Sequence, residues 1–288
     1  MTMEEINENV IIKGADDKQY LRLYHFMPTN YLAKVLLKDE IKVSFPEYCN
    51  DPLEFLAAGQ NEISKPGGFI SFSARCDSSL MWAHYANSHK GVCLEFLFPV
   101  LEVKEKYGIT SRGKNPTTIA CVLSIDNPKQ FYALPVSGQQ SHIPLMVKVV
   151  YRSERPFRSQ SYGFTSGPVV FRNNERHFIT ERHGIAAEYY IKSEEWKYEQ
   201  EWRLMIENRS VNSMRPAPCY VGGLCKHLNG IILGKKFNEQ TEIDKDMIIK
   251  CLEANSHFHD GSRPLPNISQ AEFDDKEYKI IVRQLQKE

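Results

Sequence analysis

Two glutamates separated by one residue are the feature of this sequence best suited to chemistry. Glu199 and Glu201 lie in the segment 196–203, which reads WKYEQEWR. If this segment is extended, Glu199, Glu201 and Arg203 project to one side, where two like charges repel unless a cation, a ligand or solvent compensates. Arg203 or a bound cationic substrate can supply that compensation. The pattern therefore indicates either a carboxylate site or an exposed, salt-bridged face.

Three further segments carry side chains that could bind a ligand. His25 lies in the alternating run LYHF, Ser71 and Ser73 share one face of an expected strand, and Tyr85 lies on the helix that follows. A single histidine in a strand is usually structural, and an aromatic stripe on a helix is usually core. Each segment alone is therefore as consistent with packing as with a site.

Common catalytic and metal-binding signatures are absent from the sequence. It contains no phosphate-binding loop, no dinucleotide glycine pattern, no H-E-x-x-H and no G-x-S-x-G. The HFHD run at 257–260 offers two imidazoles and a carboxylate, but no helix or strand frames it. We therefore expect no metal site.

The composition is that of a globular protein with a sizeable core. The chain has 288 residues, 42% hydrophobic and 25% charged, and its 36 basic and 36 acidic residues cancel. Zero net charge gives no general attraction to nucleic acid or membrane, and no apolar run approaches the roughly 20 residues that span a bilayer. The acidic N-terminus lacks signal-peptide features, and the seven scattered cysteines contain no C-x-x-C pair. These features predict a cytoplasmic protein with reduced thiols and no membrane partner.

The hydrophobic pattern predicts many short strands and few helices, which indicates an α+β domain. We expect residues 1–19 to form a leader, residues 20–288 to form a single domain, and residues 99–142 to be a peripheral insertion in it. The expected strands are 21–26, 41–45, 69–73, 92–98, 144–151, 229–234 and 278–282, and the expected helices are 31–39, 80–90 and 242–254.

Taken in order, five segments resemble a widespread bacterial family of unknown function. The family carries L-Y-H-[FY], N-D-P-x-E, M-W-x-H-Y-A…H-K-G-V-C, W-x-Y-E-x-E-W-R and I-I-L-G. The corresponding segments are Leu23–Phe26, Asn50–Glu54, Met81–Cys93, Trp196–Arg203 and Ile231–Gly234. The resemblance covers residues 20–240, and the joint pattern is more specific than any of its parts.

The same order of segments is similar to ADP-ribosyltransferases of the histidine–tyrosine–glutamate type, related to diphtheria toxin. That resemblance implies a split mixed β-sheet core with flanking helices, NAD as the substrate and no metal. It also implies roles for three residues. His25 would hold the adenosine ribose, Tyr85 would stack on nicotinamide, and Glu201 would face the nicotinamide ribose.

The resemblance assigns supporting residues too, with one departure. Diphtheria-type proteins carry a second tyrosine on the same helix, whereas Trp82 is off that face, so Tyr24 or Phe26 would share the stacking. Glu199 would orient the incoming nucleophile, as in members with an E-x-E pair. The hydroxyls of Ser71 and Ser73 would support the glutamate or the ribose.

The expected activity is therefore NAD-dependent transfer of ADP-ribose to a macromolecular acceptor, protein or nucleic acid. A role as a bacterial toxin or antiviral defence effector, with an antitoxin or regulatory partner, would fit this activity. Three alternatives stay open: an NAD glycohydrolase, an NAD-using RNA 2′-phosphotransferase, and a non-catalytic module. The module would bind nucleic acid or an acidic protein through the arginine-rich stretch 152–182.

Overall fold

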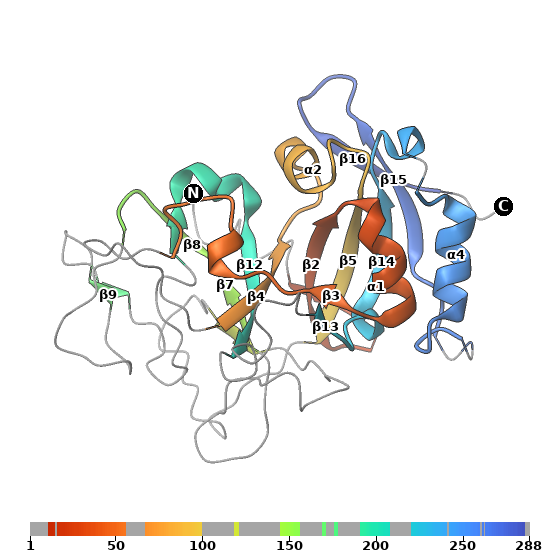
Figure 1. The fold of residues 1–288 in the computed structure, drawn as a ribbon, viewed down its shortest axis with the longest axis horizontal. Helices are drawn as coiled ribbons and strands as arrows, with labels where there is room; N and C mark the ends of the chain where they lie inside the picture. Colours follow the sequence, from red (N-terminus) through yellow and green to blue (C-terminus); the bar gives the residue numbers. More distant parts are fainter. Residues whose placement is uncertain are drawn as a thin grey trace, which may run out of the picture.

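The structure is a computed structural model in which one large sheet is flanked by a few helices (Figure 1). The residues that it describes are 11–14, 16–55, 67–99, 118–120, 145–155, 169–170, 176–177, 191–207, 220–240, 242–259, 261 and 263–285.

Strands and helices alternate irregularly along the chain, as expected for an α+β protein. The strands are β1 Ile11–Lys13, β2 Gln19–Met27, β3 Ile41–Lys42, β4 Gly67–Ser73, β5 Val92–Pro99, β6 Thr118–Ala120, β7 Leu145–Lys148, β8 Val150–Arg152, β9 Val169–Val170, β10 Arg176–His177, β11 Ile191–Ser193, β12 Glu201–Glu207, β13 Tyr220–Val221, β14 Leu228–Leu233, β15 Asn267–Phe273 and β16 Ile280–Gln284. The α-helices of the described residues are α1 Leu32–Lys38, α2 Ser79–Tyr85 and α4 Lys245–Ala254, and the 3-10 helix η5 spans Glu194–Glu199.

The main sheet has ten strands in the order β16-β15-β14-β5-β2-β4-β12-β7-β6, with β1 added alongside β2. Strands β14 and β15 run parallel, whereas the other neighbours in this sheet run antiparallel. The sheet is therefore mixed, and the predicted α+β class with a mixed sheet and few helices is confirmed.

The sheet opens between β2 and β4. Strand β2 pairs with β5 along eight positions, and β4 pairs with β12 along seven. Strands β2 and β4, in contrast, are paired only at Tyr24 and Ser73. Two ladders therefore meet at a seam, and Figure 1 shows β4, β7 and β12 on one side of it and β2, β5 and β14 on the other.

Apolar side chains cover both faces of the β2 half, because successive residues of a strand point to opposite faces. Leu21 and Leu23 belong to the larger core, together with buried residues of α1 and α4. Tyr24 and Phe26 belong to a smaller core with Met81 of α2. Helices α1 and α4 thus cover one face of this half, and α2 covers the other (Figure 1).

Some expected elements differ in extent from the observed ones. The helix expected over 80–90 ends at Tyr85, and residues 87–89 have positive φ angles, which end a helix. Ser78 caps α2 by accepting a hydrogen bond from the Met81 amide. Strand β15 had no sequence signal, since its sequence NISQAEF is largely polar.

The leader and the insertion are described only in part. Strand β1 pairs with β2, so the segment expected as a leader contributes a strand to the sheet. Of residues 99–142, only Pro99 and β6 are described, and the rest of that predicted insertion lies outside the described residues. Most of the arginine-rich stretch 152–182 lies outside them as well. Among the helices that are described, none has the length and apolar character to cross a bilayer.

Candidate functional site

A cluster of buried, ionisable side chains lies where β4, β11, β12 and η5 meet. Its members are Glu54, Lys192, Glu199, Glu201 and Arg203, each with less than a tenth of its surface exposed. Charged side chains are seldom buried unless they are paired, because leaving water costs several kcal/mol per charge. The contacts within this cluster supply that pairing.

Strand register brings the β4 and β12 members of the site together. Arg203 lies opposite Ser71, and Glu201 lies opposite Ser73. Alternation directs Glu201 and Arg203 to one face of β12, while Trp202 between them enters the larger core. The predicted shared face of Glu201 and Arg203 is therefore present.

Glu199 reaches the cluster by a different route from the one predicted. It ends η5, and Gln200 then adopts a left-handed conformation with φ 44° before β12 begins. The prediction that Glu199 projects from the same extended strand as Glu201 is therefore wrong. The turn nevertheless keeps both carboxylates within reach of one ammonium group, that of Lys192.

The carboxylate of Glu201 is surrounded by donors. Oε1 accepts hydrogen bonds from Ser71 Oγ at 2.6 Å and from Arg203 Nε at 2.8 Å. Oε2 accepts from Arg203 Nη2 at 2.8 Å and faces Lys192 Nζ at 3.4 Å. Burial alone would raise the pKa of Glu201, but Arg203 and Lys192 outweigh it and hold the pKa at about 2. Glu201 is therefore a permanent anion near neutral pH.

The neighbouring carboxylate, Glu199, has the opposite tendency. The Tyr85 hydroxyl donates a hydrogen bond to Glu199 Oε1 at 2.5 Å, and Lys192 Nζ lies 2.6 Å from Oε2. Burial and the charge of Glu201 raise the pKa of Glu199 in spite of these two partners. Two carboxylates whose pKa values are pushed apart are suited to different roles, one as a fixed anion and the other as a proton carrier.

Lys192 and Glu54 belong to the site, although neither was predicted as a site residue. Lys192 Nζ lies 2.6 Å from Glu199, 3.4 Å from Glu201 and 3.5 Å from Glu54. Burial would lower the pKa of Lys192, but the three carboxylates together raise it. The repulsion expected between Glu199 and Glu201 indicated that a cation was needed, but it did not identify Lys192. The N-D-P-x-E motif contained Glu54, but it did not show that Glu54 contacts the cations of this cluster.

His25 is connected to the cluster through Ser71. Its Nδ1 lies 2.9 Å from the carbonyl oxygen of Ser71, and because a carbonyl only accepts, Nδ1 carries the proton. Burial lowers the pKa of His25, so the imidazole is neutral near pH 7 and its Nε2 is an acceptor. Ser71 thus contacts His25 with its carbonyl and Glu201 with its hydroxyl.

The two predicted tyrosines have different positions. Tyr85, at the end of α2, reaches Glu199 directly. Tyr24 is buried beneath α2, with its hydroxyl 3.4 Å from Glu95. Because Tyr24 and His25 are adjacent in β2, they point to opposite faces of the strand. The structure therefore separates Tyr24 from His25, but it packs Tyr24 in the same small core as Tyr85 and pairs it with Ser73.

Ser73 supports the backbone of the site. Its hydroxyl donates to the carbonyl oxygen of Glu199 at 2.7 Å, and the side chain is fully buried. A second backbone contact comes from Tyr151, whose hydroxyl accepts a hydrogen bond from the Glu201 amide at 2.7 Å. These two bonds fix the turn that carries both glutamates.

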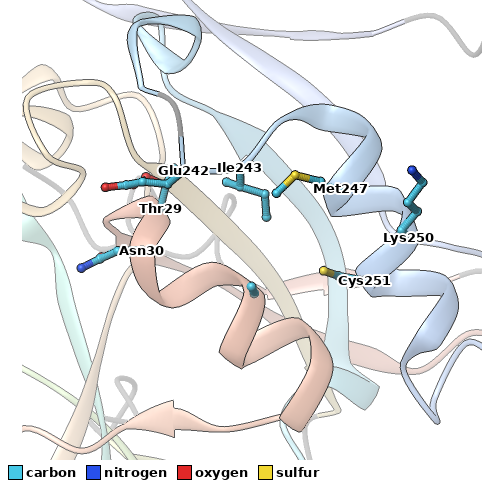
Figure 2. A pocket seen from close by; sticks show the side chains of 8 residues that line it. Thr29, Asn30, Glu242, Ile243, Met247, Lys250 and Cys251 are labelled. Carbon is cyan, nitrogen blue, oxygen red and sulfur yellow. The ribbon is translucent and has the colours of Figure 1, made fainter.

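Within the described part of the chain, no group of three histidine, cysteine, aspartate or glutamate side chains is arranged so that it could hold a metal ion. In the HFHD segment, His257 Nε2 instead lies 3.0 Å from Asp39 Oδ2. A separate open groove of about 540 Å³ lies between α1 and α4, and Figure 2 shows that side chains from both helices line it. None of its lining residues belongs to the charged cluster: they are Thr29, Asn30, Ala33, Glu242, Ile243, Met247, Lys250 and Cys251.

Comparison with known proteins bears on part of this site. Residues 81–204 match the model of a family described as "Protein of unknown function (DUF2971)". The matched span includes Tyr85, Lys192, Glu199, Glu201 and Arg203, and thus most of the cluster. No curated protein and no solved structure matches the chain. The similarity to the ADP-ribosyltransferase fold therefore stays a prediction.

Proposed function

We propose that this protein is an NAD-dependent ADP-ribosyltransferase that cleaves the bond between nicotinamide and ribose. The observation that carries the proposal is the meeting of Glu201 and His25 at Ser71, beside the seam of the sheet. These are the residue types that hold NAD and stabilise its ribose in the family that the sequence resembles. Tyr85 is linked to Glu201 indirectly, because its hydroxyl donates to Glu199 and Lys192 contacts both glutamates.

The chemistry needs a fixed negative charge near the ribose. When the glycosidic bond breaks, nicotinamide leaves with the bonding electron pair as a neutral molecule, and the ribose becomes an oxocarbenium ion. Carboxylates stabilise such ions in glycosidases. Glu201 is held as an anion with a pKa of about 2. One preorganised group of this kind contributes roughly 2.7–4 kcal/mol to the stabilisation of a transition state.

The remaining residues fit the other steps of the reaction. The incoming nucleophile must lose a proton as it forms its bond to the ribose carbon, and Glu199, with its raised pKa, can take that proton. The neutral His25 can accept a hydrogen bond from a ribose hydroxyl through Nε2. Of the donors around Glu201, Lys192 is the most distant at 3.4 Å, so it is the donor that a ribose hydroxyl would replace.

The acceptor decides between two outcomes of the same chemistry. A protein or nucleic acid as nucleophile gives ADP-ribosyl transfer, whereas water gives NAD hydrolysis. We propose transfer to a macromolecular acceptor in the context of bacterial defence, because the resemblance that supports NAD use also implies it. Hydrolysis is the second candidate, since Glu199 could activate water equally well.

The proposal is tested with NAD labelled in both its nicotinamide and its adenosine part, with and without cell extract. We expect release of nicotinamide by the native protein and a fall of about 10²–10³-fold in Glu201→Gln, because that variant keeps the shape and loses the charge. Glu195→Gln, on the exposed side of η5, is the matched control and should retain full activity. Unchanged turnover in Glu201→Gln, or no nicotinamide release in any mixture, would overturn the proposal.

A further inference from the structure

One carboxylate of the buried cluster is held differently from the other two. Within the described residues, Glu54 has two side-chain partners, both cations: it forms an ion pair with Arg203 and lies 3.5 Å from Lys192. Glu199 and Glu201 also accept hydrogen bonds from hydroxyl groups. Glu54 is therefore held in the cluster by the two cations, of which Arg203 also donates a hydrogen bond to it.

The number of charges leaves one carboxylate in excess. Among the described residues, the cluster has three carboxylates, those of Glu54, Glu199 and Glu201, and two cations, Lys192 and Arg203. Without Glu54, the two cations would balance the charges of Glu199, at the end of η5, and Glu201, at the start of β12. An incoming anion could then occupy the position of Glu54 without changing the number of charges buried in the protein.

The segment that carries Glu54 has the features of a removable cover. It belongs to no strand or α-helix and is closed by two short-range hydrogen bonds, from the amides of Leu53 and Glu54 to Asp51. Leu53 points outward with 57% of its surface exposed, whereas Glu54 points inward. Phe55 has a φ angle of 66°, which bulky residues seldom adopt, and its ring packs against Phe69. Such strained positions cluster at sites that switch between conformations.

The geometry of Arg203 suits a phosphate group. Its Nε and Nη2 atoms hold Glu201 from one edge, while Nη2 also contacts Glu54. The parallel donors of Arg203 are thus used by Glu201, and Glu54 is held by Nη2 alone. Because guanidinium N–H groups donate to carboxylate and phosphate oxygens alike, a phosphate oxygen can replace the oxygen of Glu54 at Nη2. Lys192 adds a second positive charge at the same place.

We propose that Arg203 and Lys192 form a binding site for a phosphate group of the substrate, and that Glu54 occupies this site until the substrate displaces it. The inference rests on the proposed function, because NAD carries a pyrophosphate next to its ribose rings. Glu54 is then an internal competitor of the substrate. The protein binds anionic substrates only when the segment 51–55 moves away from the cluster.

Inorganic pyrophosphate is the probe, and its binding is measured by calorimetry at fixed ionic strength. Glu54→Gln should bind it at least about tenfold more tightly than the native protein, because the competing charge is gone and the open form is more populated. Glu47→Gln lies on the same stretch of chain with its side chain exposed, and should bind like the native protein. Adding Lys192→Met to Glu54→Gln should abolish the gain.

A second measurement uses the native protein alone, so it does not require that any variant folds. Saturation with pyrophosphate should speed hydrogen exchange at the amides of Leu53 and Glu54, which bond to Asp51 in the closed form. Equal affinity of the native protein and Glu54→Gln, no binding to either, or slower exchange at these amides would overturn the inference.

The two proposals fail in different ways. Tighter pyrophosphate binding by Glu54→Gln without any cleavage of NAD would retain the anion site and reject the proposed function. NAD cleavage by the native protein, with equal binding of pyrophosphate by all the single variants, would retain the proposed function and reject the role of Glu54.

Discussion

Two buried carboxylates in this protein are neutralised in different ways. Asp39, after α1, accepts hydrogen bonds from the backbone amides of Gly223 and Cys225, both at 2.7 Å, and lies 3.0 Å from His257. Glu201 lies on β12, and within the described residues the donors to its carboxylate are the side chains of Ser71, Arg203 and Lys192, with no backbone amide among them.

This difference separates an architectural carboxylate from one that can take part in chemistry. Backbone amides are fixed by the fold, so Asp39 joins the end of α1 to the loop after β13 and cannot exchange its donors. Side-chain donors can rotate away, so a ligand can replace one of them at Glu201. The cluster around Glu201 also contains further carboxylates, which a purely structural ion pair does not need.

The largest effect is expected from removing the central cation of the cluster. Arg203→Met leaves Glu201 and Glu54 without their main partner, and a broken buried ion pair costs about 3–5 kcal/mol of unfolding free energy. Urea denaturation measures this loss. Arg283→Met is the control, because its pair with Glu272 is partly exposed and should contribute less than about 1 kcal/mol. A loss no larger than that of the control would show that the cluster is not tightly coupled.

Acid should destabilise the protein through Glu201. Its pKa is about 2 in the folded protein and 4.5 without its partners, so its contribution is complete above pH 4.5 and is lost as the pH falls toward 2. A difference of this size corresponds to about 3 kcal/mol. The free energy of unfolding, measured by urea denaturation between about pH 6 and about pH 3, should fall less with decreasing pH in Glu201→Gln than in the native protein.

Glu199 provides the opposite control for this pH dependence. Its pKa is raised in the folded protein, so its contribution to stability is largest at low pH and falls as the pH rises. In Glu199→Gln, the free energy of unfolding should therefore fall with decreasing pH at least as steeply as in the native protein. Parallel curves for all three proteins would contradict the ion pairing described for Glu201.

A smaller effect is expected at the architectural carboxylate. Asp39→Asn keeps a residue that tolerates the φ of 53°, but its amide group cannot accept from both backbone donors. Leaving one buried amide unsatisfied costs about 1–3 kcal/mol. Nicotinamide release per folded molecule should not change. A loss of activity at full stability would mean that Asp39 and the cluster are not independent.

The sequence predicted the apolar parts of the fold well. Strands β2, β5 and β14 follow runs of apolar residues, and α4 follows a stripe of them. Strand β15 was missed because its polar residues carry no strand signal, although its backbone pairs with both β14 and β16. Periodicity reports burial, and an element that is fixed mainly by its neighbours gives little periodicity.

The site was predictable only where a motif carried it. His25, Ser71, Tyr85 and Glu201 belong to segments whose order suggested a common site, and the structure brings these four into one connected set. Lys192 belongs to no motif, and Glu54 ends the N-D-P-x-E segment without a predicted role, because an ion pair between distant segments depends on the folded chain. The missed residues are thus those whose roles arise from side-chain contacts.

The single paired position between β2 and β4 has a mechanical consequence. Each ladder is stiffened by its own row of backbone hydrogen bonds, whereas the hinge between them has almost none. A small rotation of one ladder against the other would alter the span from His25 to Glu201 and leave both rows intact. Because few backbone hydrogen bonds would have to break at this seam, the two ladders can separate here to admit a molecule as long as a dinucleotide.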